Sequence, residues 1–483
     1  MTEKNTSYIV YGYGMKGDCL NMTKEIVEDR PDRRTGSGQN RMGTHPIFPL
    51  IVKMSLPAMF SMLIQALYNI VDSVYVSRLG EEALSAVSLI YPVQLMSVAL
   101  GVGTGAGLSS LISRRLGEER QEEADQTATH GLFLAVCSWV VFALFGLFFS
   151  DIFVQAFSDD PLLTVPAASY CRIVTMGSVF VFTAINAERT MQATGSMILP
   201  MLCALSGAIV NIVLDPIMIF GLYGFPAMGV AGAALATVIG QAIAMVMALS
   251  LLLTRPFPVH IRLRGFRPRA TIIKDVYIVG FPSIVMQSVA SVLTLGLNAL
   301  LIQFSATAVA VLGVYYKVQT FVFLPVFGMN QGLLPVLGYN YGARNKVRLQ
   351  RAFSIGIATA LVIMLFGTFV FQTYPREIMS LFRAEGDLMR MGIDALRIIS
   401  LCYPSAAIGI LISTFFQATG HGIYALISSI MRQLVLLLPL AYLLAYTMGL
   451  DAVWWAYVIS DVASACVSLY LLRRLWKKQI QFM

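Results

Sequence analysis

A carboxylate stands at Asp215 within an apolar run, residues 199–220, that is long enough to cross a bilayer. The surrounding segment reads Asn211-Ile-Val-Leu-Asp215-Pro216. An ionisable side chain costs free energy in hydrocarbon, so such a residue usually faces a cavity and has a function there. Asp215 is therefore a candidate functional residue. The structural alternative is an Asp that satisfies backbone groups freed by Pro216 at a helix kink.

Three more polar residues suit the same chemistry. Asn211 lies four residues before Asp215, and residues four apart share one face of a helix. Asp72 and Thr237 stand in two other apolar runs. Two carboxylates, an amide and a hydroxyl that converge can hold a proton or Na⁺, because oxygen ligands suit a hard cation. The residue types leave the choice of ion open, and the alternative for Asp72 is an acid that caps a helix end.

The composition is that of an integral membrane protein. Hydrophobic residues make up 57% of the 483 residues, charged residues only 12%, and the mean hydropathy is +0.72. Long apolar runs predict transmembrane helices rather than barrel strands, which are short and alternating. The net charge of +8 comes largely from loops, as topology signals do, so no nucleic-acid site is predicted. The cysteines and histidines lack metal-ligand spacing, so we expect no resident metal, no cofactor and no enzyme activity.

Twelve helical spans are expected, and basic residues orient them. Eighteen Lys and Arg residues fall in the loops on one side of the membrane and four on the other, which places both termini in the cytoplasm. The protein is thus predicted to be an all-α protein of the cell membrane, embedded in the lipid bilayer. The spans are expected at residues 50–77, 84–114, 125–150, 164–191, 198–220, 229–253, 272–300, 308–339, 349–373, 388–418, 424–446 and 450–475.

The two halves of the chain repeat each other at one constant offset, without a gap. The offset pairs Pro57 with Pro282, and Gln192-Ala-Thr-Gly195 recurs as Gln417-Ala-Thr-Gly420. A tetrapeptide and several Gly and Pro pairs at one offset indicate two pseudo-symmetric six-helix lobes, related by an axis along the membrane normal.

The repeat divides the chain into five parts. We expect a cytoplasmic, disordered tail at 1–45, in which Met42 is a candidate functional start. The linker between the lobes is predicted to be cytoplasmic and partly helical on the membrane surface. The remaining bounds are 46–254 for the first lobe, 255–274 for the linker, 275–475 for the second lobe and 476–483 for a cytoplasmic tail.

The topology also gives the depth of the polar residues. Asp72 lies about five residues, or roughly 7–8 Å, from the outer end of the first span. Asp215 and Thr237 have a similar depth, so all three fall in the outer half of the first lobe. The second lobe has Leu297 and Leu440 at the positions that correspond to Asp72 and Asp215. The ion site is therefore predicted in the first lobe alone.

Other intramembrane side chains are candidates for a substrate cavity or for ion pairs. In the second lobe, Lys317 and Arg432 are either counter-charges or members of structural ion pairs. Aromatic faces attract organic cations, and methionine adapts to varied shapes. The candidate cavity residues are Gln65, Tyr68, Asn69, Met286, Tyr315, Gln331 and Tyr403.

Several motifs together resemble the MATE family of multidrug and toxic-compound exporters, most closely its MepA-like bacterial branch. The resemblance covers about residues 45–475. Besides the repeated Gln-Ala-Thr-Gly and the Asn211–Pro216 segment, the motifs are Val71-Asp72-Ser73-Val-Tyr-Val-Ser-Arg-Leu-Gly80, Gly229-Val-Ala-Gly-Ala-Ala-Leu-Ala-Thr237 and Tyr339-Asn-Tyr-Gly-Ala-Arg344-Asn.

The resemblance implies two six-helix lobes in a V and export of small-molecule organic cations in exchange for H⁺ or Na⁺ by alternating access. It implies ion ligands at Asp72, Asn211, Asp215 and Thr237, and we expect a monomer. Acids that some relatives carry in helices 7 and 10 have only Asp275 and Asp394 as counterparts, at the span ends. The alternative function is a flippase for lipid-linked oligosaccharides from the same superfamily.

Overall fold

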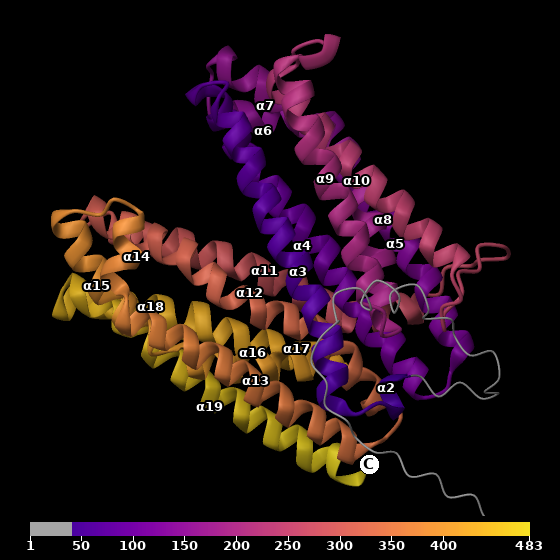
Figure 1. Cartoon of the computed structure of the whole chain (residues 1–483). Coiled ribbons are helices and arrows are strands. Elements are labelled where there is room, and N and C mark those ends of the chain that lie inside the picture. Colours follow the sequence, from indigo (N-terminus) through magenta and orange to yellow (C-terminus); the bar gives the residue numbers. More distant parts are fainter. Residues whose placement is uncertain (1–40) are drawn as a thin grey trace, which may run out of the picture. The chain divides into compact units, whose positions relative to one another are not determined.

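The computed structural model describes residues 41–483, and the regular structure of these residues is helical throughout. The predicted tail lies outside the described residues except for its last few positions. There the chain forms the short helix α2 (Arg41–Thr44). The structure therefore describes the membrane part of the chain and the turn that leads into it (Figure 1).

The first half of the described chain folds into one helix bundle. In it α9 packs along α10 and α3, while α8 packs against α4, α5 and α10. The helices are α3 (Ile47–Ser77), α4 (Glu81–Gly117), α5 (Gln121–Phe148), α6 (Ser150–Gln155), α7 (Pro161–Met176), α8 (Ser178–Ala193), α9 (Ile198–Phe220), the short η1 (Leu222–Gly224) and α10 (Gly229–Thr254). We call this bundle the first lobe.

The second half forms a second bundle with a similar order of helices. Here α12 packs on α13, α11 on α17, and α16 on α13 and α19. The helices are α11 (Ala270–Leu301), α12 (Ala306–Gly342), α13 (Lys346–Thr373), α14 (Pro375–Leu381), α15 (Gly386–Ser400), α16 (Tyr403–Ala418), α17 (Gly422–Ile430), η2 (Met431–Leu437), α18 (Leu438–Met448), η3 (Leu450–Trp454), α19 (Trp455–Lys478) and η4 (Ile480–Phe482). This bundle is the second lobe.

The number of spans agrees with the sequence prediction. Within the described residues, ten helices are long and apolar enough to cross a membrane, and two bent pairs pass the same test together. The pairs are α7 with α8, bent by 41°, and α15 with α16, bent by 49°. When each pair is one broken span, the described chain has twelve.

The two lobes meet through an interface that follows the internal repeat. α4 packs against α11, and α12 packs against α3 in the same way. Gly103 on α4 lies against Ile284 of α11, and Gly328 on α12 lies against Met59 of α3. The offset that pairs Pro57 with Pro282 also pairs the two glycines and their two partners. The interface is therefore two-fold in the way that a symmetric homodimer interface is.

The C-terminal ends of α4 and α12 cross closely on the pseudo-symmetry axis. A Cβ atom on Gly117 would lie 2.8 Å from the backbone N of Ala343, and one on Gly342 would lie 2.9 Å from the backbone C of Arg114. Real Cβ atoms do not approach backbone so closely, so this crossing requires glycine at both positions.

Polar contacts join the lobes at the same end. Arg115 Nη2 of α4 lies 3.4 Å from Asp275 Oδ2 of α11. Arg348 Nη2 of α13 donates to the carbonyls of Met42 (3.1 Å) and His45 (2.8 Å), just before α3. We call these two sets of contacts the arginine latches.

Residues 255–269 of the predicted linker contain no helix, and α11 begins within the predicted linker, at Ala270. The backbone of residues 255–269 is bonded instead to side chains of α5. The N–H of His260 donates to Asp125 Oδ1 (2.9 Å), and the N–H of Arg262 donates to Thr129 Oγ1 (3.1 Å). The N–H of Arg269 donates to His130 Nε2 (2.8 Å). These bonds satisfy backbone donors that a helix would have satisfied internally.

Candidate functional site

The predicted ion ligands come from three helices that pack on one another. α9 contacts both α3 and α10, and α10 also contacts α3. Along α9 the buried residues include Gly207, Asn211 and Asp215, which recur at four-residue intervals and therefore form one stripe. Pro216 lies inside this helix and removes one backbone donor directly after Asp215. The sequence thus directs the polar pair of α9 toward α3 and α10 rather than toward lipid.

The structure brings the four predicted ligands together. Asn211 Nδ2 lies 3.3 Å from Asp215 Oδ1 and 3.2 Å from Thr237 Oγ1, and it donates to both. Asp215 is fully buried, and Asn211 is 2% exposed. The carboxyl groups of Asp72 and Asp215 lie close enough to interact with each other. Tyr68 lies at the same place, close enough to Asp72 and Asp215 to interact with both carboxyl groups.

Several oxygens of this cluster have no hydrogen-bond partner among the described residues. They are Asp72 Oδ1, Asn211 Oδ1 and Asp215 Oδ2. Gln241 Oε1, one turn beyond Thr237 on α10, also has no partner among these residues. Carboxylate and amide oxygens are acceptors only, so a bound cation or an added proton satisfies them. The donor set therefore fits H⁺ or Na⁺. In the described part of the chain no group of three His, Cys, Asp or Glu residues could hold a metal ion.

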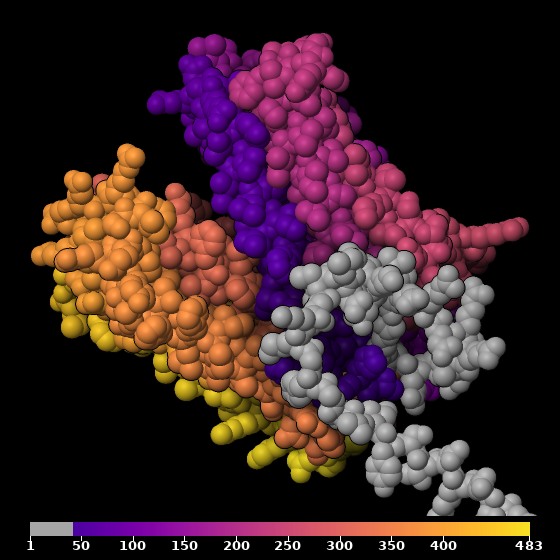
Figure 2. All heavy atoms as spheres, in the orientation of Figure 1, coloured from indigo at the N-terminus to yellow at the C-terminus, as the bar shows by residue number. Residues whose placement is uncertain are grey.

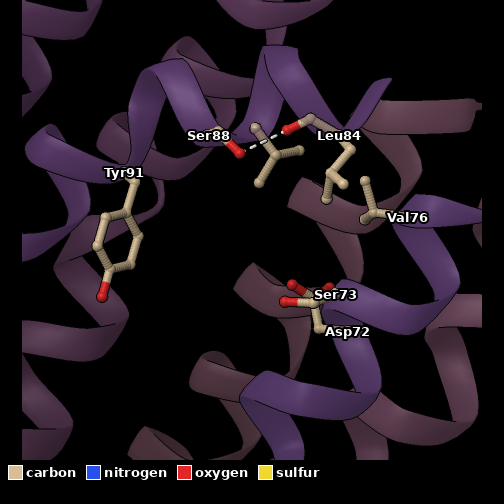
Figure 3. Close-up of a pocket in the computed structure, with 7 residues that line it drawn as sticks. Asp72, Ser73, Val76, Leu84, Ser88 and Tyr91 are labelled. Atoms are coloured by element: carbon tan, nitrogen blue, oxygen red, sulfur yellow. Dashed lines mark hydrogen bonds between the residues drawn. The ribbon is translucent and has the colours of Figure 1, made fainter. Parts of the chain in front are cut away.

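A cavity of about 200 Å³ lies beside Asp72, between the end of α3 and the beginning of α4. Figure 3 shows Asp72 and Ser73 on α3, with Ser88 and Tyr91 on α4. Val76, Leu84 and Val87 complete the wall. Asp72 therefore borders the cavity on one side and the buried Asp215 on the other. This position suits a residue that passes a cation between the cavity and the buried cluster.

The predicted substrate-cavity residues fall into two groups. Gln65 and Asn69 are exposed and Tyr68 is half-buried, and all three belong to α3. The first helices of the chain are drawn in indigo in Figure 2. Met286 on α11 and Gln331 on α12 are also half-buried.

Two of the predicted cavity residues lie instead in the core of the second lobe. Tyr315 is 1% exposed and Tyr403 is fully buried. Both pack among aromatic rings, with Tyr403 against Phe323 and Phe371, and Tyr315 against Tyr457. The structure therefore brings Tyr68 to the ion cluster and keeps the other two tyrosines away from it.

Two residues of interest were not singled out from the sequence. Gln241 is one turn from Thr237, and the four-residue spacing between them could have identified it in the sequence. Asp461 is an acid within the last apolar span and is 7% exposed. Its Oδ1 lies 3.8 Å from Arg432 Nε, so Arg432 has an acidic partner in the second lobe. The rule that singled out Asp215, an acid inside an apolar run, applies equally to Asp461.

Comparisons with known proteins agree with this architecture. The model of the MatE family matches residues 57–217 and again 282–443, so the two matches start at the Pro57 and Pro282 pair of the internal repeat. The chain is 26% identical over 435 residues to the "Multidrug export protein MepA" of Staphylococcus aureus strain MSSA476. That alignment covers 89% of this chain and 94% of the relative.

Two solved structures are also similar over nearly the whole described chain. One is described as the outward-facing conformation of a multidrug resistance MATE family transporter of the MOP superfamily. It has a TM-score of 0.86 at 30% identity, and the match covers 93% of this chain and 100% of that one. The other is a MOP superfamily transporter from Pyrococcus furiosus, described as having a binding pocket of reverse polarity. Its TM-score is 0.85 at 30% identity, with 92% and 100% of the chains covered.

Proposed function

The chain belongs to the MatE family, and from this membership we propose that it is a multidrug efflux transporter that exports amphiphilic organic cations in exchange for H⁺ or Na⁺. It is a membrane transporter and not an enzyme. The observation that supports coupling best is the buried cluster of Asp72, Asn211, Asp215 and Thr237, with its partnerless oxygens. A buried carboxylate pair needs a counter-charge, and an exchanged cation supplies one.

In the proposed cycle, the cation and the substrate use the first lobe in turn. Cation binding at Asp72 and Asp215 removes the repulsion between the two carboxylates and draws α3 toward α9 and α10. The exposed part of α3 carries Gln65 and Asn69, so movement of this helix changes the surface offered to the substrate. Loss of the cation restores the charge, and the site becomes attractive to an organic cation again.

Alternating access is the proposed route across the membrane. The lobes contact each other where α4 and α12 end, and the positive-inside rule puts that end and both termini on the cytoplasmic side. With the cytoplasmic ends held together by the arginine latches, the described arrangement suits substrate release to the outside. Opening toward the cytoplasm requires both latches to break. We expect one chain, a monomer, to complete the cycle.

The first test separates this function from lipid-linked oligosaccharide flipping. The protein is placed in liposomes, and an H⁺ or a Na⁺ gradient is imposed separately. We expect a fluorescent organic cation to move against one of these gradients, and a labelled lipid-linked sugar to remain in its leaflet. Flipping of the sugar without cation transport would contradict the proposal and support the alternative.

A further inference from the structure

The second lobe contains its own intramembrane charge pair. Asp461 lies on the buried face of α19 and is 7% exposed, and Arg432 lies in η2 with 30% of its side chain exposed. Their closest atoms, Arg432 Nε and Asp461 Oδ1, are 3.8 Å apart. This is a long contact for a charged pair, and one side of it reaches the surface of the lobe. Arg432 is therefore held loosely, by a carboxylate that is itself buried.

Two irregular helix segments meet at this pair. η2 is a π-helix in the middle of the eleventh span. π-helical turns are rare and occur frequently at functional sites. The tenth span breaks between α15 and α16, where Cys402 is 3% exposed and lies near Asp461. Asp461 therefore lies beside the two spans whose helical geometry is interrupted.

A group of tyrosines begins next to Asp461. Tyr457 is one turn before Asp461, and its hydroxyl lies 3.1 Å from that of Tyr316. The hydroxyls of Tyr315 and Tyr403 are buried beside them without a well-formed hydrogen bond. The titratable or charged groups that interact with Asp461 in the described part of the chain include Arg432, Cys402 and Tyr457. Among these described groups, Arg432 is thus the cation that faces Asp461.

The internal repeat has small residues in the first lobe at the positions of these side chains. At the offset that pairs Pro57 with Pro282, the positions of Arg432, Cys402, Tyr457 and Asp461 correspond to Gly207, Gly177, Gly232 and Ala236 in the first lobe. The first lobe packs there with the smallest residues. A buried ion pair is often no more stabilising than well-packed apolar side chains, so stability alone is a weak reason for this one.

The same comparison relates Asp461 to the first-lobe cluster. Ala236 is the neighbour of Thr237, so Asp461 is one residue from the second-lobe position that matches a predicted ion ligand. The second lobe therefore has a carboxylate on its sixth span at the depth where the first lobe has carboxylates on its first and fifth.

We propose that Asp461 is a proton-exchange site of the second lobe. Its carboxylate holds the Arg432 guanidinium in this conformation, and a proton takes the place of the guanidinium during transport. The inference rests on the proposed antiport function and adds a second exchange site to it. Tight packing around Asp461 suits a proton, which needs no coordination space. The proton binds a carboxylate oxygen, the Nε contact breaks, and Arg432 moves toward the surface that it already reaches.

An infrared measurement detects the proton directly. The full chain, with Asp72→Asn and Asp215→Asn to remove the first-lobe carboxylates, is studied in liposomes at neutral and acidic pH. We expect a protonated-carboxyl band to grow on acidification and to disappear when Asp461→Asn is added. Asp394→Asn, which removes an exposed acid of the same lobe, is expected to leave the band in place. A band that is unchanged by Asp461→Asn would overturn the proposal.

A transport measurement separates exchange from a structural role. The double variant Asp461→Asn with Arg432→Gln removes both charges and leaves no unpaired charge. If the pair were purely structural, this replacement would cause no loss of transport. We expect this double variant to be folded and to bind a fluorescent organic cation, but to lose efflux driven by a proton gradient. Efflux equal to that of the unmodified protein would overturn the proposal. If the unmodified protein itself lacked efflux, the proposed function would fail, and the infrared result would still decide the role of Asp461.

Discussion

At the scale of the residue, Asn211 organises the first-lobe cluster. One amide group donates to a carboxylate and to a hydroxyl on two different helices, at 3.3 Å and 3.2 Å. Its own oxygen has no partner among the described residues and remains free to accept. Asn211 therefore orients Asp215 and Thr237 and adds a third oxygen to the site.

Replacing this amide tests its role. We expect Asn211→Ala to lower the free energy of unfolding by about 1–3 kcal/mol, because it leaves buried polar groups unpaired. We also expect it to abolish gradient-driven efflux. The matched control is Asn186→Ala, since Asn186 is equally buried in the same lobe but donates to the carbonyl of Gly131 at 2.8 Å. Thermal unfolding and dye efflux are measured for both. Equal loss of efflux in the two variants would show that Asn211 acts through stability alone.

The sequence predicted much of this cluster and missed the pair in the second lobe. Asp72, Asn211, Asp215 and Thr237 were grouped by depth, because helix rise and loop charge give the height of each residue in the membrane. The sequence does not predict Asp461 from the repeat, because the second lobe has leucines at the positions that correspond to Asp72 and Asp215. Which buried acid faces which cation depends on helix rotation, and spacing alone did not give the 3.8 Å approach of Arg432.

At the scale of the helix, the crossing of α4 and α12 is the most constrained contact between the lobes. We expect Gly342→Ala to force these helices apart, since the new Cβ atom would meet the backbone of Arg114. Gly313→Ala on the same helix is the control, because nothing lies within 4 Å of its Cβ position.

The measurement for this pair of variants is the labelling of cysteines introduced at the ends of α4 and α12. We expect faster labelling in Gly342→Ala and unchanged labelling in Gly313→Ala. The control is also expected to gain stability slightly, because alanine favours a helix over glycine by about 0.5–1 kcal/mol. Unchanged labelling in Gly342→Ala would mean that the crossing relaxes easily.

The linker between the lobes gives a second prediction at this scale. Asp125 is 2% exposed and holds both the backbone of His260 and, at 3.6 Å, the guanidinium of Arg262. We expect Asp125→Ala to release the linker from α5, so that trypsin cleaves after Arg262 several times faster. Glu122→Ala on the same helix is the control, because its exposed side chain accepts from Gln126 of its own helix. Equal cleavage of the two variants would contradict the docking of the linker on α5.

The prediction of helices was better than the prediction of the segments between them. The repeated Gln-Ala-Thr-Gly marks the ends of α8 and α16, where Gly195 (φ 91°) and Gly420 (φ 83°) adopt the left-handed conformation that stops a helix. The repeat was therefore recognised through a structural signal. The docking of the linker on α5 was not predicted, because the side chains of α5 that bind the linker backbone are distant from it in the chain.

At the scale of the whole molecule, the arginine latches join the two lobes at the end where α4 and α12 cross. The internal repeat relates the two latches. Arg115 and Arg348 each also contact a side chain of their own lobe, and the residues of these two contacts occupy matching positions in the repeat. Arg115 Nε lies 3.0 Å from Glu123 Oε2, and Arg348 Nε lies 3.3 Å from Asn340 Oδ1. The repeat pairs Glu123 with Arg348 and Arg115 with Asn340. Each lobe thus provides one arginine that holds the other lobe.

Removing a latch is expected to favour opening at that end. We expect Arg348→Ala to raise the labelling of a cysteine placed at Ser110, which is buried and donates to the carbonyl of Gln417 across the interface. Arg351→Ala, an exposed arginine one turn further along α13, is the control. Labelling that does not differ between the two variants would show that Arg348 does not hold the lobes together.

The central claim is that the Asp72 and Asp215 carboxylates couple a cation gradient to export. The most direct measurement is efflux of a fluorescent organic cation from liposomes under separate H⁺ and Na⁺ gradients, compared between the unmodified protein, Asp72→Asn and Asp215→Asn. We predict that one gradient drives efflux by the unmodified protein and that neither variant responds to it, although both still bind the dye. Gradient-driven efflux retained by both variants would contradict the account.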